Sequence, residues 1–148
     1  MKHCVAMLLL SVSLLSGCAS SGRLSAGEQL AAHQAAAGEP VPSFRFVGHL
    51  VGWTEIDDTH LAVQSRPSQS WLLTLAHGCP GLEWAQGIGL TSRFDRVYAN
   101  ADKVLVPGNG RVGCRIARIQ PLDTAALKGQ LRQLRQARIE ERQDEPAG

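Results

Sequence analysis

The chain has 148 residues, of which 44% are hydrophobic and 19% charged, and its formal net charge at pH 7 is +2. A chain of this length favours one small domain. The near-neutral charge excludes the strongly basic balance of nucleic-acid-binding proteins, so we expect no nucleic-acid partner.

The N-terminus has the pattern of a bacterial export signal. A basic Lys2 precedes an apolar run, Val5 to Leu15, which is too short to span a bilayer and has the length of a signal-peptide core. The run ends in the tetrapeptide LSGC, which resembles the lipobox of bacterial lipoproteins. We therefore expect residues 1–17 to be a lipoprotein signal peptide and Cys18 to be the lipidated first residue of the mature protein.

Lipidation at Cys18 predicts a protein that sits on a membrane without spanning it. Acyl chains such as palmitate contribute roughly 0.8 kcal/mol per buried methylene, so two or three of them form a stable anchor. Ala19 rather than Asp follows Cys18. By resemblance to the sorting rule of bacterial lipoproteins, this favours the periplasmic face of the outer membrane over the inner membrane.

The next segment, residues 18–43, has the composition of a flexible tether, because Ala, Ser, Gly, Gln and Glu dominate it. Within it, Ser25 and Glu28 fit a capping box for a short helix that Gly38 stops. The apolar face of this helix is mostly alanine. We therefore expect marginal helicity and no docking onto a core.

Residues 44–122 have the pattern of a succession of short strands. Strands in FRFVGHLVGW and HLAVQSR flank a turn at Asp57-Asp58, and SWLLTLA is apolar enough for a central strand covered on both faces. After the Cys79-Pro80-Gly81 corner we expect a helical turn in LEWAQG and a strand in IGLTS. RVYANADKVLV is expected to form two short strands broken at Asn100-Ala101-Asp102, and GCRIARIQPL the last strand. The apolar phase of the last strand slips between Ile116 and Ile119, which predicts a bulge. The expected fold class is mainly β (α+β), a small antiparallel barrel or sandwich of about six short strands with a C-terminal α-helix.

The C-terminal helix is predicted over residues 123–142, with Asp123 as its N-cap. Leucines at helical spacing give it an apolar face, and basic residues at spacings of 4, 3, 3 and 4 form a stripe along it: Lys128, Arg132, Arg135, Arg138 and Arg142. We interpret the stripe as a solvated face with ion pairs such as Arg138 and Glu141. The alternative is a contact surface for anionic envelope lipid or an acidic protein, carried by Arg132, Arg135 and Arg138. Residues 143–148 are expected to form a disordered tail.

The segments that carry a family resemblance lie between Gly38 and Asp123. They are GEPVPSFRFVGHLVGW, SRPSQSWLLTLAHGCPGLEWAQGIGLTS, DKVLV and CRIARIQPLD. In order and spacing the chain resembles a family of small proteobacterial lipoproteins known only as a domain of unknown function. The resemblance implies the same domain with its two cysteines, and it implies no catalytic role.

Cys79 and Cys114 are the two cysteines left to an exported chain, because Cys4 leaves with the signal and Cys18 is lipidated. We expect them to form a disulfide that closes a loop of about 36 residues. One alternative is a metal site with His77 and His60, although the paired spacings of zinc sites are missing. Another is a nucleophilic Cys79 with His77 as its base. We favour the disulfide, with no metal and no cofactor.

The densest acidic cluster contains Asp57, Asp58 and His60, beside Glu55. We interpret it as a hairpin turn; the alternative is the active site of an envelope hydrolase acting on peptidoglycan or another glycan. The aromatic residues, Phe94 among them, are expected mainly in the core; the alternative is that they line a ligand groove for a glycan or peptide. Trp84 is the one expected to be partly exposed and is a candidate contact residue.

Together these features favour a non-enzymatic binding or assembly module of the cell envelope. Its expected partners are the membrane, reached through the N-terminal lipid, and either an envelope protein or an anionic envelope lipid.

Overall fold

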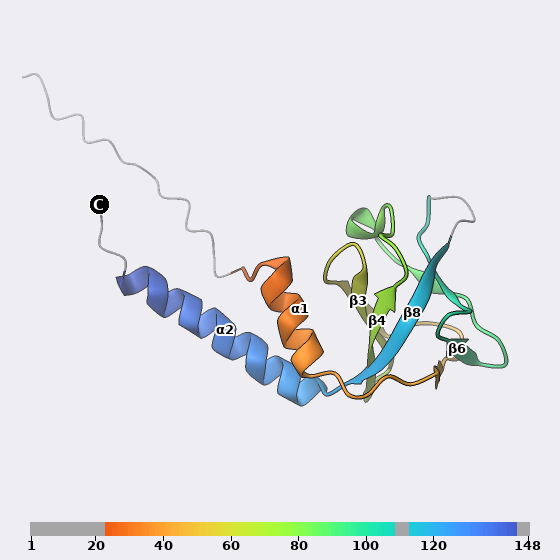
Figure 1. Cartoon of the computed structure of the whole chain (residues 1–148), viewed down its shortest axis with the longest axis horizontal. Coiled ribbons are helices and arrows are strands. Elements are labelled where there is room, and N and C mark those ends of the chain that lie inside the picture. The colour runs from red at the N-terminus through yellow and green to blue at the C-terminus, as the bar shows by residue number, and fades with distance from the viewer. Residues whose placement is uncertain (1–22, 109–112, 145–148) are drawn as a thin grey trace, which may run out of the picture.

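The computed structural model describes residues 23–108 and 113–144; the expected signal peptide, Cys18 and the chain end from residue 145 lie outside this part. In the described residues there are two α-helices, one 3₁₀ helix and eight strands (Figure 1). In chain order they are α1 (Ala26–Ala35), β1 (Ser43–Arg45), β2 (Gly52–Glu55), β3 (His60–Arg66), β4 (Gln69–Leu75), η1 (Leu82–Trp84), β5 (Gly89–Leu90), β6 (Arg96–Tyr98), β7 (Lys103–Leu105), β8 (Gly113–Leu122) and α2 (Thr124–Asp144).

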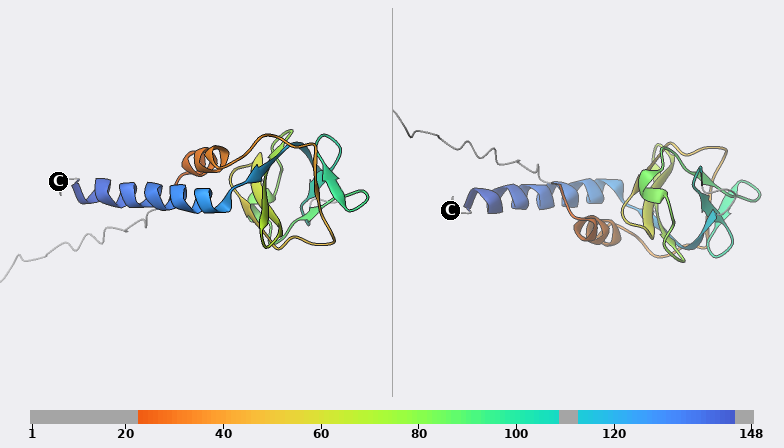
Figure 2. Two further views of the ribbon diagram at one scale, coloured as in Figure 1. Left: turned by 90° about the horizontal axis from the view of Figure 1, so that it is seen from below. Right: turned by 90° about the horizontal axis from the view of Figure 1, so that it is seen from above.

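The strands form one antiparallel sheet of six, in the order β2-β3-β4-β8-β7-β5, and a separate pair, β1 with β6. The larger sheet curls into a half-barrel, and α2 extends away from it (Figure 2). The predicted class, mainly β with a C-terminal helix, is confirmed. The strand count is higher than expected because FRFVGHLVGW is not one strand. Gly48 has a positive φ of 81°, and the chain turns there from β1, which pairs with β6, to β2, which pairs with β3.

β4 is buried on both faces, as its apolar sequence predicts. Leu73 is fully buried in the main core inside the half-barrel. Its neighbour Leu72 points to the opposite face, because side chains alternate along a strand. There it packs in a second cluster with Ala36, Ile56 and Leu122. A single strand therefore supports both the barrel core and the layer beneath the helices.

The predicted bulge in β8 is present. Thr74 pairs with Arg118 and Leu75 pairs with Ile116, so Ala117 has no partner on β4. In a regular strand, residues three positions apart lie on opposite faces. The extra residue changes this alternation, and as a result Ile116 and Ile119 are both fully buried in the same core.

Helix α1 differs from the expected loose tether, because it is docked. Its capping box forms as predicted: the Ser25 N–H donates to Glu28 Oε2 at 2.8 Å, and the Glu28 N–H donates to Ser25 Oγ at 3.3 Å. However, His33 is buried, and the helix packs along α2 (Figure 1). The alanine face is too weak to anchor a helix alone, but its small side chains allow the close approach of a second helix.

The connection from α1 to β1 is held against the end of β8. The Gly38 N–H donates to the Pro121 carbonyl at 2.8 Å, and the Asp123 N–H donates to the Ala36 carbonyl at 3.0 Å. The C-terminal end of α1 therefore lies beside the N-terminal end of α2, and the two helices form an antiparallel pair.

Asp123 caps α2 as predicted, because its Oδ1 accepts hydrogen bonds from the N–H groups of Ala125 at 3.0 Å and Ala126 at 2.9 Å. No residue of α2 is buried, although Leu127 packs against the second cluster. Within the described ranges, neither α-helix combines the length and the hydropathy of a membrane span.

The predicted disulfide is present between Cys79 and Cys114, whose Cα atoms are 5.6 Å apart. It ties the corner after β4 to the start of β8. Cys79 is 4% exposed and belongs to the main core. Because its sulfur is bonded, Cys79 is not a free nucleophile.

Asp102, at the predicted break between two strands, is a buried carboxylate. Its exposed fraction is 2%. One oxygen accepts from the Thr91 hydroxyl and the other from the Tyr98 N–H, both at 2.7 Å. The Thr91 hydroxyl oxygen in turn accepts from the Lys103 N–H at 2.9 Å. This carboxylate therefore holds β6, β7 and the end of β5 together.

Asp102→Ala should lower the free energy of unfolding by about 3 kcal/mol, because it removes two hydrogen bonds to a charged group and leaves the Tyr98 N–H without its acceptor. Urea denaturation followed by tryptophan fluorescence measures the loss. Glu39→Ala, at an exposed carboxylate, is the control and should change stability by less than about 0.5 kcal/mol. An equally small effect of Asp102→Ala would contradict the role given to this residue.

Replacing Cys79 and Cys114 together by Ala should cost about 3–4 kcal/mol, since the disulfide closes a long loop in the unfolded chain. The comparison is made by urea denaturation without reductant. Reduction of the wild-type protein should give the same loss, and no further loss should follow when reductant is added to the double variant. If reductant leaves the free energy of unfolding of the wild-type protein unchanged, the disulfide does not contribute to its stability.

Candidate functional site

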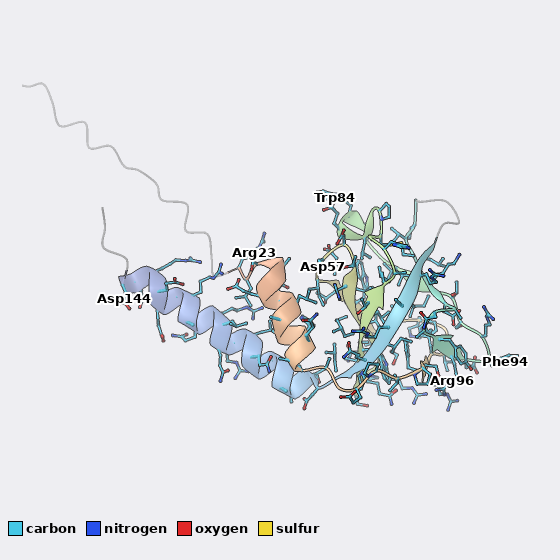
Figure 3. All side chains as sticks on the ribbon, in the orientation of Figure 1. Arg23, Asp57, Trp84, Phe94, Arg96 and Asp144 are labelled. Carbon is cyan, nitrogen blue, oxygen red and sulfur yellow. A yellow bond between two sulfur atoms is a disulfide. The ribbon has the colours of Figure 1, made fainter. Side chains whose placement is uncertain are left out.

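An acidic depression lies beside the disulfide corner. It is a cavity of about 380 Å³ lined by three carboxylates, Glu55, Asp58 and Glu83, and by the chain from Gly78 to Gly81. Glu55 ends β2, Asp58 lies in the turn before β3, and Glu83 belongs to η1. Figure 3 shows η1, marked by Trp84, above the turn that contains Asp57.

The corner and the turn are locked to each other. The Cys79 N–H donates to the Asp58 carbonyl oxygen at 2.8 Å. A Cβ at Gly78 would lie 2.9 Å from Asp58 Oδ2, so a side chain at that position would displace the Asp58 carboxylate. Gly81 then begins η1 with a φ of 80°, in the left-handed region that favours glycine. The local sequence HGCPG thus sets the distance between the turn and η1.

The carboxylates around this depression have different proton affinities. Burial raises the pKa of Glu55, and the negative charges of Glu83, Asp57 and Asp58 raise it further. Burial acts in the same direction on Asp57, but hydrogen bonds from the Thr59 N–H, His60 and the Thr59 hydroxyl outweigh it and lower the pKa of Asp57. Glu55 therefore retains a proton to higher pH than Asp57 does.

The acidic cluster predicted from the sequence divides into two parts. Asp57 Oδ1 accepts from the Thr59 N–H at 2.8 Å and lies 3.0 Å from Nδ1 of His60, so these residues form a local turn network. This is the turn chemistry that the sequence predicts. Asp58 instead faces the depression with Glu55 and Glu83. Glu83 was missed because 28 residues separate it from Glu55, and no spacing rule relates them.

The proposed metal ligands do not converge. Across residues 23–108 and 113–144, no group of three or more His, Cys, Asp or Glu side chains has an arrangement that could hold a metal ion. His77 lies on the other side of the disulfide, where it lines a cavity of about 360 Å³ with Lys103 and Arg115.

A second concave region lies between the α1–α2 pair and the sheet. This groove has a volume of about 400 Å³, and its lining comes from α1, α2 and strands β2 to β4. His33 is a buried member whose Nδ1 lies 2.6 Å from the Gln29 carbonyl oxygen, so that nitrogen carries the proton and donates. Trp53 lies on the strand side and Arg135 on the α2 side.

The aromatic residues separate into core and surface. Trp71 stacks on Phe44 with ring centroids 4.9 Å apart, and its Nε1 donates to Ser65 Oγ at 2.9 Å, which confirms the core assignment. Trp84 is 77% exposed, in agreement with the prediction. Phe94, which was expected in the core, is 94% exposed in a loop where its φ is 50°. This tight turn directs the ring into solvent.

The basic stripe of α2 is shorter than predicted, because Arg138 is engaged by α1. Arg138 Nη2 lies 2.6 Å from both carboxylate oxygens of Glu28, and Nη1 donates to the Arg23 carbonyl at 3.2 Å. The expected partner was Glu141, one helical turn away. A partner on α1 is available because the two helices are antiparallel. Lys128, Arg132 and Arg135 remain exposed.

Glu28 lies at the centre of this contact between the helices. Hydrogen bonds from the backbone and side chain of Ser25 lower the pKa of Glu28, and the Arg138 guanidinium lowers it further. One carboxylate therefore completes the capping box of α1 and binds α2.

Comparison with known proteins gives a family and no activity. No curated protein and no solved structure matches the chain significantly. The model of a family of unknown function, DUF6491, matches residues 1–138, which include the N-terminal segment, the half-barrel and most of α2. The chain therefore belongs to the DUF6491 family of unknown function.

Proposed function

We propose that this protein is a non-enzymatic binding or assembly module of the bacterial cell envelope, anchored by lipid at Cys18 to the periplasmic face of the outer membrane. The observation that carries the proposal is the tetrapeptide LSGC at the end of a short apolar run that follows a basic N-terminus. It combines an export signal with a lipidation site, and Ala19 after the cysteine favours the outer membrane.

The disulfide supports an extracytoplasmic location. Structural disulfides persist in oxidising compartments, the bacterial periplasm among them. The Cys79–Cys114 bridge is built into the core of a small β domain, which suits a protein that works outside the reducing cytoplasm.

The exposed aromatic residues support a binding role. Trp84 and Phe94 are large apolar side chains left in solvent, on η1 and on the loop before β6. In Figure 3, Arg23 lies beside α2, and Phe94 lies at the far end of the half-barrel from it. A lipid anchor upstream of Arg23 would leave Phe94 free to meet a partner.

The lipid anchor predicts a specific mass and a specific dependence on Cys18. Protein extracted from membranes should begin at Cys18 and should carry diacylglycerol and fatty-acid mass on it. Cys18→Ser should abolish that mass and leave the signal uncleaved, whereas the control Cys4→Ser, within the segment to be removed, should leave processing unchanged. Intact-mass spectrometry of each fraction measures this. If the mature wild-type protein carries no acyl mass, the proposed lipid anchor at Cys18 is wrong.

An envelope hydrolase is a second candidate, favoured by the acidic depression. General acid–base chemistry on a glycosidic bond needs one carboxyl that holds its proton and one that is ionised. Glu55 has the raised pKa of the first kind, and Asp58 and Glu83 line the same cavity.

For the hydrolase candidate, Glu55→Gln and Asp58→Asn should each lower turnover of isolated peptidoglycan by at least about 100-fold, the usual contribution of one acid–base group. Glu39→Gln, on the exposed segment before β1, is the matched control and should leave turnover unchanged. Release of soluble fragments measures the reaction. If wild-type protein releases none, the hydrolase candidate is removed and the binding role stands.

A further inference from the structure

The charges of α2 are separated into two faces. With 3.6 residues per turn, Lys128, Arg132 and Arg135 fall within an arc of about 60°. We call these three residues the basic face; all are exposed. The acidic residues of the helix, Glu140, Glu141 and Asp144, fall outside this arc on the other side. Ion pairs within the helix therefore do not neutralise the basic face.

An exposed apolar residue lies in the same arc. Ile139 is 42% exposed and falls between Lys128 and Arg132 in the projection along the helix axis. A helix that lies on a membrane presents basic side chains together with apolar ones, since the first meet phosphate groups and the second enter the acyl boundary.

The start of the described chain is bound to the same helix. The Arg23 carbonyl accepts a hydrogen bond from Arg138, one residue before Ile139. Cys18 is five residues upstream, so even a fully extended chain places it at most about 18 Å from Arg23. Along α2, Arg132 is only about 9 Å from Arg138, at 1.5 Å per residue. A lipid on Cys18 would therefore bring the membrane surface within reach of the basic face.

We propose that the basic face of α2, with Ile139, binds the anionic phospholipid surface of the membrane in which the Cys18 lipid is inserted. This inference rests on the lipid anchor of the proposed function for its geometry, and on the charge separation of α2 for its chemistry. The helix then lies against the headgroups, and the half-barrel is held at the other end of α2 (Figure 1). The complementary charge would suit an anionic lipid surface or an acidic protein, and the short chain from Cys18 to Arg23 favours the lipid surface.

The test uses the acylated full-length protein reconstituted in vesicles. A polarity-sensitive thiol dye is attached at Ile139→Cys, and in a second sample at Glu140→Cys, about 100° further around the helix and outside the basic face. In vesicles of phosphatidylcholine with 30% phosphatidylglycerol, dye emission at position 139 should shift to shorter wavelength and should return when salt is raised. Phosphatidylcholine vesicles should give no shift, and position 140 should give little shift in either.

Charge variants quantify the contact. Each basic side chain near an anionic surface changes the binding equilibrium by about fivefold, so Arg132→Gln with Arg135→Gln should lower the ratio of docked to undocked helix by about 25-fold. Gln133→Glu with Gln136→Glu changes the net charge equally and is the matched control; its effect should be much smaller. Circular dichroism verifies that each variant keeps its helices.

The outcomes separate this inference from the proposed function. Equal emission in neutral and anionic vesicles, or equal effects of the two variant pairs, overturns the membrane contact and leaves an acidic protein as the occupant of the basic face. Acyl mass on Cys18 is measured on the same samples. If that mass is missing but the shift in anionic vesicles is present, the anchor has failed and the lipid-binding face stands.

Discussion

The burial of β4 on both faces is the constraint on which the rest of the structure depends. Leu73 fills the half-barrel, and Leu72 on the opposite face provides the apolar surface that Ala36 and Leu122 cover. Without that second surface, the chain before β1 would have nothing to pack against at the base of α2. The α1–α2 pair is thus held on the sheet by this second surface, although α2 itself has no buried residue.

Features set by neighbouring residues could be predicted from the sequence. The Asp123 cap, the Ser25 box, the central position of β4 and the β8 bulge all follow from local patterns, and the structure confirms each one. The disulfide was predicted because Cys79 and Cys114 are the two cysteines that remain in an exported mature chain, and an oxidising compartment favours their pairing. These predictions succeeded because the physical cause lies within a few residues or in a pairing with few alternatives.

Features that join distant segments could not be predicted. Arg138 and Glu28 are 110 residues apart, and each had a plausible local partner. Glu83 meets Glu55 only because the HGCPG corner folds η1 back over the β2–β3 turn. Phe94 was misassigned because hydrophobicity alone does not reveal a left-handed backbone. The sequence therefore predicted only part of the candidate site. Glu55 and Asp58 could be named from it, but the cavity and its third carboxylate, Glu83, could not.

The attachment of α1 also has a mechanical consequence. Tension applied to the N-terminus passes first into the Glu28–Arg138 contact and then into the backbone hydrogen bonds that join Ala36 and Gly38 to the end of β8. β8 pairs with β4 on one side and β7 on the other, so the load enters an interior strand of the sheet. Peeling begins most easily at a sheet edge, and this attachment keeps the pulling force away from β2 and β5.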